Sequence, residues 1–306
     1  MIMGKITVAD LEAMHNSGEL AGKTFTADQL TNETYHAGPG ISHSGLKTLG
    51  TKSPEHYRYE TTIGRKPPTD AMKAGTRLHM KILEPELFDS TFAVKPSGMS
   101  FAKKDGKQWR DEQLDAGKEI IAYSDVENIF GMAQAIKYHP VAGPLLNLPM
   151  VCEQSIYWND KKTGVLCRCR PDIVAYSDGS PLMIDLKKTQ DCSLDAISKA
   201  INNFSHHTQA PFYARGYKAV HGVEPAFLFI FVEEKPPHGV RVVTLVNGDI
   251  DPQNPNEGWA YDFGAMANKH RLDVYAQCLE ADRWPGYQTN GIEEVDLPRY
   301  AYQKEL

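Results

Sequence analysis

The chain has 306 residues, of which 41 % are hydrophobic and 24 % are charged, with 24 glycines and 19 prolines. These proportions are those of a globular protein and exclude collagen-like, disordered and coiled-coil classes. The formal net charge of −6 at pH 7 is opposite to that of a protein that coats nucleic acid through charge alone. A smaller basic surface within an acidic molecule is still compatible with local phosphate contacts.

The sequence has no segment suited to a membrane. Its longest apolar runs, such as 226–232, are about seven residues long, whereas a membrane-spanning helix needs about twenty. The first residues, Met1 to Lys5, lack the charged and then apolar pattern of a signal peptide. The five cysteines include no C-x-x-C pair, which predicts reduced thiols. We therefore expect a cytoplasmic protein that is not bound to a membrane.

The N-terminal part of the chain is predicted to be mainly helical. We expect residues 1–40 to form a polar, irregular N-terminal extension with one short helix at about 8–16. Ser42 or Ser44 is placed to cap the next helix. Pro54 starts another, because proline favours the first turn of a helix.

A helix and a polar segment follow. Asp70 is placed to cap a helix over 71–83 that carries His79. Residues 95–118 are rich in lysine and have no clear apolar period. That pattern predicts a solvated, mobile loop, with a flap that faces nucleic acid as the alternative. The helical pattern returns at about 125–138.

After residue 150 the hydrophobic period changes to two, which is typical of strands. Three strands are predicted as an antiparallel meander, at 151–158, 165–176 and 182–188. Beyond them the sequence predicts helices at 193–204, 208–220 and 261–280, and strands at 226–234 and 240–246. No repeat and no flexible linker divides the chain, so we expect one domain over 41–290 and a C-terminal tail over 291–306.

Two aspartates and a lysine are placed to converge on this meander. Alternation puts Arg168, Arg170 and Asp172 on one face of the second strand. Asp185 and Lys187 share a face of the third strand. Two carboxylates a few ångströms apart repel unless a cation lies between them, and oxygen ligands suit Mg²⁺ or Mn²⁺. Lys187 could then orient or deprotonate a water, or neutralise charge on a phosphate, which is the chemistry of phosphodiester hydrolysis.

The spacing of these residues resembles a known motif. Pro171-Asp172 followed by Asp185-Leu186-Lys187 on the next strand is similar to the motif of the PD-(D/E)XK nuclease superfamily. Gln209 and Tyr213, at i and i+4 on one helical face, resemble the Q-x-x-x-Y element of its RecB-like branch.

Other segments resemble one group within that branch, exonuclease VIII and the RecE-type phage recombination exonucleases. The helix with His79, followed by Leu83-Glu84-Pro85, is similar to the helix that carries a histidine to the metal in that group. Glu153 lies on the preceding strand, where relatives often carry an acidic residue. The segment Trp284-Pro285-Gly286-Tyr287 fits the end of the same family. The resemblance spans roughly residues 40 to 290.

The resemblance implies an α/β (α+β) fold, with a central mixed β-sheet flanked by helices. It implies a bacterial or phage-encoded 5′-to-3′ exonuclease that acts on double-stranded DNA ends in homologous recombination. It also implies Mg²⁺ as the cofactor, with Mn²⁺ able to substitute, a ring-shaped homo-oligomer around the duplex, and a single-strand annealing protein as a partner.

The roles implied for individual residues follow from the same motifs. The metal ligands would be His79, Asp172, Asp185 and the main-chain carbonyl of Leu186. Lys187 would activate the attacking water, and Gln209 and Tyr213 would contact DNA. Arg168, Arg170 and Lys188 are candidate phosphate contacts.

Other readings of the motif are a restriction or repair endonuclease on the same core and a catalytically idle DNA-binding protein. RecB-like relatives with an iron–sulfur cluster need three cysteines after the Q-x-x-x-Y element. Only Cys278 follows Tyr213, which excludes that arrangement.

Overall fold

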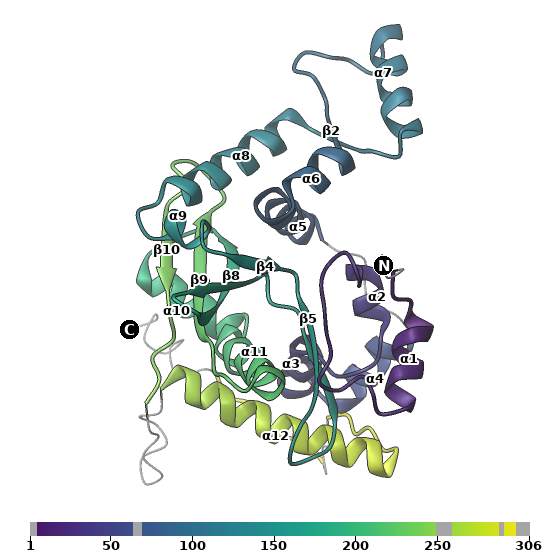
Figure 1. Ribbon diagram of the computed structural model, residues 1–306, viewed down its shortest axis with the longest axis vertical. Helices are drawn as coiled ribbons and strands as arrows, with labels where there is room; N and C mark the ends of the chain where they lie inside the picture. The colour runs from purple at the N-terminus through teal and green to yellow at the C-terminus, as the bar shows by residue number, and fades with distance from the viewer. Residues whose placement is uncertain (1–4, 64–68, 249–258, 288–290, 298–306) are drawn as a thin grey trace.

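A five-stranded mixed sheet forms the centre of the molecule. The structure is a computed structural model that describes residues 5–63, 69–248, 259–287 and 291–297. The strands lie in the order β10-β9-β8-β7-β4 (Figure 1). Their bounds are β4 (Met150–Cys152), β7 (Ile173–Ser177), β8 (Ser180–Thr189), β9 (Ala226–Glu233) and β10 (Val240–Val243). Strands β8 and β9 are parallel and the other neighbours are antiparallel. The expected mixed sheet flanked by helices is confirmed.

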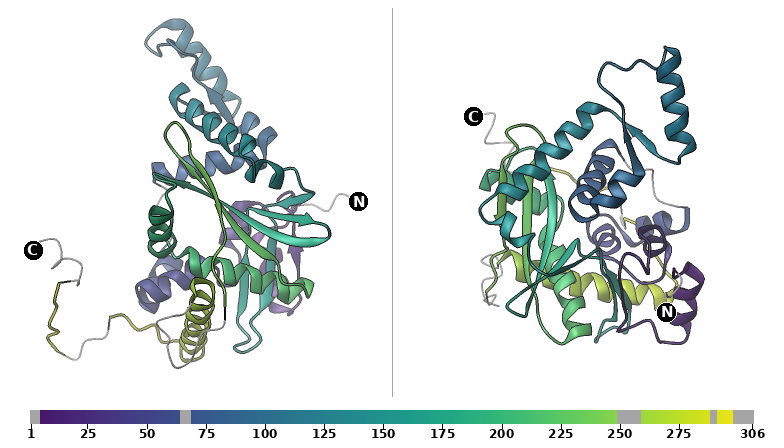
Figure 2. Two further views of the ribbon diagram at one scale, coloured as in Figure 1. Left: turned by 90° about the vertical axis from the view of Figure 1, so that its left-hand side faces the viewer. Right: turned by 45° about the horizontal axis from the view of Figure 1, so that its top comes forward.

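Helices cover both faces of this sheet because alternate strand residues are apolar on each side. On one face, Ile184 and Leu186 pack in a core with α5 (Asp70–Leu83) and α8 (Tyr123–Tyr138). On the other face, Met183 packs in a second core. The helices of that face are α3 (His43–Thr51), α10 (Leu194–Asn203), α11 (His206–His221) and α12 (Ala260–Ala281). Figure 2 shows the two helical layers on either side of the sheet.

A second, three-stranded sheet joins the N-terminal residues to the domain. It has the order β1-β5-β6, with β1 (Thr24–Phe25), β5 (Ser155–Asn159) and β6 (Leu166–Cys169). Helices α1 (Val8–Asn16) and α2 (Asn32–Ala37) pack beside it around the buried ring of Tyr157. Residues 5–40 are therefore more ordered than expected. Their apolar residues show no period, since they come from separate short elements that meet only in the fold.

Two of the predicted strands are each broken in two. The run 151–158 is divided into β4 and β5, and the run 165–176 into β6 and β7, so that each half joins a different sheet. The breaks fall at Glu153 and at Pro171, and they lie side by side, because the Glu153 amide donates to the Asp172 carbonyl at 3.0 Å. A hydrophobic alternation that continues across a break does not reveal it.

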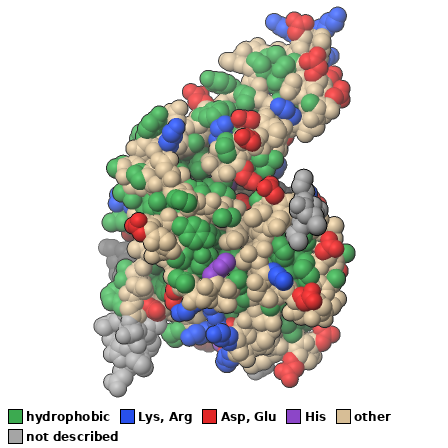
Figure 3. Space-filling model, in the orientation of Figure 1, with side chains coloured by type: hydrophobic (Ala, Val, Ile, Leu, Met, Phe, Trp, Pro, Cys, Tyr) green, Lys and Arg blue, Asp and Glu red, His purple; other side chains and the backbone are tan. Residues whose placement is uncertain are grey.

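Half of the segment predicted as a loop over 95–118 is helical. Helix α6 (Pro85–Thr91) leads into β2 (Phe92–Val94), and α7 (Lys104–Asp115) leads into β3 (Glu119–Ile121). β2 and β3 pair in parallel, and the segment forms an arm that extends from the body (Figure 1). The surface in Figure 3 shows Lys and Arg side chains at the outer end of this arm. Helix α7 has few apolar residues, so it lacks the period that identifies a buried helix.

Most other helices begin close to their predicted positions. Ser42 caps α3 as expected, and Ser193 caps α10. The cap of α5 is Thr69 and not Asp70. Helix α11 starts after Ser205, two residues before the predicted start at 208, and Thr208 lies buried within it. The remaining helices are α4 (Pro54–Ile63) and α9 (Ala142–Leu145). Within the described residues, none of the helices has the length and apolar character needed to cross a membrane. The predicted C-terminal tail lies outside the described residues from 298 onward.

Candidate metal centre

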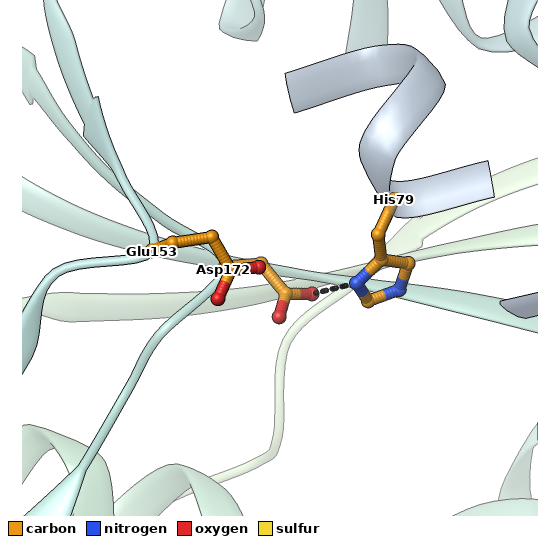
Figure 4. A group of neighbouring side chains, drawn as sticks. All are labelled: His79, Glu153 and Asp172. Atoms are coloured by element: carbon orange, nitrogen blue, oxygen red, sulfur yellow. Dashed lines mark ion pairs between the residues drawn. The ribbon is translucent and has the colours of Figure 1, made fainter. Parts of the chain in front are cut away.

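Three side chains meet at the junction of the two sheets (Figure 4). His79, Glu153 and Asp172 each offer one ligand atom, and these atoms all lie within 4.8 Å of one another. His79 comes from α5, Glu153 from the break between β4 and β5, and Asp172 from the residue before β7. The group combines one imidazole and two carboxylates, a donor set that suits a divalent cation.

The two chain breaks aim the carboxylates at one point. Glu153 has a φ of 51°, a left-handed conformation that is uncommon outside glycine and costs on the order of 1 kcal/mol. Asp172 follows Pro171 and precedes the Ile173–Ile184 pair, so it lies opposite Asp185 in the β7–β8 register. Its Oδ2 accepts a hydrogen bond from the Leu186 amide at 2.8 Å. The Asp172 carboxylate is therefore fixed by the strand that carries the rest of the motif.

The orientation of His79 follows from its contact with β8. Its Nε2 lies 2.9 Å from the Leu186 carbonyl oxygen, to which it donates. In the neutral ring this leaves Nδ1 unprotonated, and Nδ1 lies 3.6 Å from Oδ2 of Asp172. A second hydrogen bond of this kind commonly holds a metal-binding histidine in place. The Leu186 carbonyl, predicted as a metal ligand, is in contact with the His79 ring.

The electrostatics of the group fit a bound cation. Burial, and then the charge of the nearby Asp172 carboxylate, raise the pKa of Glu153 to about 8. Burial also raises the pKa of Asp185 to about 6, although the Lys187 charge opposes this rise. Buried carboxylates that repel one another are stabilised as anions when a divalent cation neutralises them.

Asp185 lies beside the three-residue group, in contact with two other predicted residues. It is 2 % exposed, and its Oδ2 forms an ion pair with Lys187. Its Oδ1 accepts a hydrogen bond from Gln209 Nε2 at 2.6 Å. The fold thus brings Gln209 to the motif strand from α11. Tyr213, one turn further on, packs its ring against Phe227 at a centroid distance of 6.3 Å, and burial raises its pKa.

Arg168 and Arg170 do not lie where a phosphate could reach them, which corrects their predicted role. They are 5 % and 7 % exposed. Arg168 donates to the carbonyls of Tyr35, His36 and Gly38, and Arg170 donates to Ser155 Oγ and the Leu30 carbonyl. Both guanidinium groups lie over the Tyr35 ring. They attach the N-terminal residues to the sheet, and their alternation with Asp172 is lost at the break at Pro171.

Lys188 lies on the opposite side of β8 from Lys187. Its Nζ pairs with Glu234 at 2.9 Å, and its side chain is 13 % exposed. It lines a charged cavity with Lys73 and Arg77. Its charge is balanced by Glu234. Its phosphate-contact role stays a prediction.

Glu153 is a member of the candidate metal group to which the sequence assigns no role. Its place on the preceding strand is evident, but a continuous strand over 151–158 gives no reason for its side chain to turn toward Asp172. The only local sign of the break is that two polar residues, Glu153 and Gln154, interrupt a run of strand-forming residues.

Comparison with known proteins identifies the family. The model of a family described as a PDDEXK-like domain of unknown function (DUF3799) matches residues 42–297. No curated protein matches the chain. Among solved structures, the chain is similar to the crystal structure of a "Putative exonuclease" from Eubacterium rectale, with a TM-score of 0.53 and 11 % identity over 91 % of this chain and 99 % of that chain. This similarity shows a shared fold.

A second solved structure, SSO0001, aligns with a TM-score of 0.27 and 12 % identity over 65 % of this chain and 86 % of that chain, which is too low to support an argument. The family model, by contrast, spans most of the sequence and both halves of the motif. The chain therefore belongs to the PDDEXK-like family, within the PD-(D/E)XK nuclease superfamily that its motifs indicate.

Proposed function

We propose that the protein is a metal-dependent exodeoxyribonuclease that degrades double-stranded DNA from its ends in the 5′-to-3′ direction. The observation that carries this proposal is the convergence of His79, Glu153 and Asp172 beside the Asp185–Lys187 pair. Half-buried carboxylates that can hold a divalent cation, next to a lysine, are suited to phosphodiester hydrolysis.

The residues of the site would divide the work. His79, Asp172 and Glu153 would hold the cation, with Asp185 and the Leu186 carbonyl as further ligands on β8. A bound divalent cation supplies positive charge at the scissile phosphate. Lys187 would hold or deprotonate the attacking water and offset the charge that develops on the phosphate oxygens. Gln209 would keep Asp185 in place. Tyr213, on the same face of α11, would pack against Phe227 and contact DNA.

We propose Mg²⁺ as the physiological metal, with Mn²⁺ able to substitute. Two or three carboxylate oxygens with water and substrate phosphate satisfy Mg²⁺, and Mn²⁺ accepts an imidazole nitrogen more readily. The test is hydrolysis of a linear duplex in each metal after treatment with EDTA.

We further propose that the enzyme works as a closed homo-oligomeric ring, in the cytoplasm of a bacterium or a phage-infected cell. A chain with a net charge of −6 has little electrostatic hold on DNA, so enclosure of the duplex would replace affinity. A single-strand annealing protein would take up the strand that is left, as the resemblance to RecE-type enzymes suggests. Light scattering on the native protein measures the size of the ring.

An endonuclease with the same metal site is the alternative function. A single experiment separates the two: incubation with linear and covalently closed duplex DNA in Mg²⁺. The exonuclease releases acid-soluble nucleotides from the linear DNA only, whereas an endonuclease also opens the closed circle. A catalytically idle DNA-binding protein changes neither.

A further inference from the structure

Two cationic side chains and two histidines gather on the α11 side of the motif strand, away from the three-residue metal group. His43 and Lys47 lie one turn apart on α3, and Gly50 follows on the same face. His43 Nε2 lies 2.8 Å from Thr208 Oγ1, and Lys47 Nζ donates to the Phe204 carbonyl at 3.1 Å. This face of α3 is thus held against the start of α11. Figure 1 shows α3, α11 and α12 side by side below the sheet.

Arg271 of α12 completes this group. Its guanidinium lies against the backbone of α3 at Gly50, where a Cβ atom would collide with Nε and Cζ. The absence of a side chain at Gly50 therefore lets the guanidinium lie across α3, one turn from Lys47. The Nη1 atom of Arg271 is buried without a hydrogen-bond partner within the described part of the chain. A half-buried guanidinium in this state is costly unless an anion compensates it.

Among the described residues, no carboxylate balances these charges. Neither Lys47 nor Arg271 forms an ion pair with any residue that the structure describes. The pKa of Lys47 is lowered by burial and then by the charges of Arg271 and Lys187. Burial and the Lys187 charge lower the pKa of His43 to about 3 and that of His206 to about 2. Both histidines are therefore neutral, and the positive charge of the cluster comes from Lys47 and Arg271. Lys187 lies between this cluster and the metal group.

We propose that Lys47 and Arg271, with the neutral rings of His43 and His206 beside them, form a binding site for a phosphate group of the DNA substrate next to the scissile phosphate. The proposal rests on the proposed nuclease function and names a part of its substrate site. A phosphate would accept hydrogen bonds from both cations and relieve their mutual repulsion. The group could be a terminal 5′-phosphate or an internal phosphodiester, which share this chemistry.

The test uses three variants of the full-length protein: Arg271→Gln, Lys47→Gln and Gly50→Ala. The Gly50→Ala change removes no charge and favours the helix, but it displaces the Arg271 guanidinium. Lys161→Gln, in an exposed turn, is the matched control. Binding of a linear duplex with a 5′-phosphate or a 5′-hydroxyl is measured by fluorescence anisotropy in Ca²⁺. Hydrolysis of bis(p-nitrophenyl) phosphate in Mn²⁺ reports the metal site alone.

We expect Arg271→Gln to weaken duplex binding about tenfold or more, as expected when a charge-assisted hydrogen bond is removed. The slope of log affinity against log salt should also fall by about 0.9 for each phosphate that the variant no longer neutralises. Gly50→Ala should weaken binding in the same direction without a lower melting temperature, and Lys161→Gln should have no effect. A defect confined to the 5′-phosphorylated duplex identifies the terminal phosphate, and an equal defect for both duplexes identifies an internal one.

Unchanged duplex affinity in Lys47→Gln and Gly50→Ala would overturn the phosphate site, even if Arg271→Gln failed to fold. The proposed function is judged separately, because it fails only if the wild-type protein hydrolyses neither DNA nor the small diester in any divalent metal.

Discussion

Replacement of Glu153 by glutamine tests whether the ionised Glu153 carboxylate destabilises the folded protein when no metal is bound. Burial raises the pKa of Glu153 to about 8 from the ordinary 4.5. Without metal, the folded protein thus binds this proton more tightly than the unfolded chain. The contribution of Glu153 to stability is therefore most favourable below pH 4.5 and declines as the pH rises to 8.

The size of the effect follows from the shift. Each pKa unit corresponds to about 1.4 kcal/mol, so the cost is on the order of 3 kcal/mol at pH 7.5 once solvent screening is allowed for. Glu153→Gln removes this cost, and a chain of this length should gain roughly 5 °C in melting temperature in EDTA. Saturating Mg²⁺ at about 100 times its Kd should stabilise the wild type by about 2.7 kcal/mol and the variant by much less.

The assay is thermal unfolding of both proteins from pH 5 to 8.5, in EDTA and in Mg²⁺, with Glu127→Gln as the exposed control. We expect the two melting curves in EDTA to converge near pH 5 and to separate as the pH rises. A variant that is less stable than the wild type at pH 8 in EDTA, with the same gain from Mg²⁺, would refute this reasoning.

Other residues give further expectations. Asp185→Asn should abolish hydrolysis and leave the melting temperature nearly unchanged, because asparagine can still accept the Gln209 hydrogen bond; measurable activity in a folded variant would exclude a ligand role. Lys187→Ala should lower kcat strongly, with little change in duplex binding in Ca²⁺. Weaker duplex binding with a normal single-turnover rate would instead show that Lys187 binds a phosphate. His79→Ala should raise the metal concentration needed for half-maximal activity about 10- to 100-fold, and more for Mg²⁺ than for Mn²⁺. If activity depends on metal concentration as it does in the wild type, His79 has a packing role. Arg168→Ala should destabilise the protein by about 2 to 4 kcal/mol in denaturant and expose residues 5–40 to protease, while hydrolysis of a small diester is spared. Unchanged stability with weaker duplex binding would instead make Arg168 a phosphate contact.

Elements with a strong period can be predicted from the sequence. Helix α12 and strand β9 lie within a residue or two of their predicted bounds. Pro285 and Gly286 mark where the helix must end, and a continuous apolar run identifies the strand. The motif on β8 also indicates the register, since Asp172 and Asp185 do lie opposite one another.

The site is less predictable where backbone geometry departs from the regular strand. Glu153 turns toward Asp172 only because its φ is 51° at a break between two sheets, and side-chain alternation assumes that no break occurs. The prediction for Arg168 is wrong for the same reason. Its alternation predicts a shared face with Asp172, but β6 leaves for the other sheet, and the guanidinium meets carbonyls of residues 35–38, more than 100 positions away in the sequence. Long-range partners of this kind leave no local pattern.

The most direct test of the central claim is the release of nucleotides, in Mg²⁺, from linear duplex DNA that is labelled at either the 5′ or the 3′ end. Covalently closed duplex is incubated alongside, and Asp172→Asn is the inactive control. Our account predicts early release of the 5′ label as acid-soluble nucleotides, retention of the 3′ label, an intact closed circle and no activity in EDTA or in the variant. Cleavage of the closed circle at the same rate, early release of the 3′ label, or full activity of Asp172→Asn would contradict it.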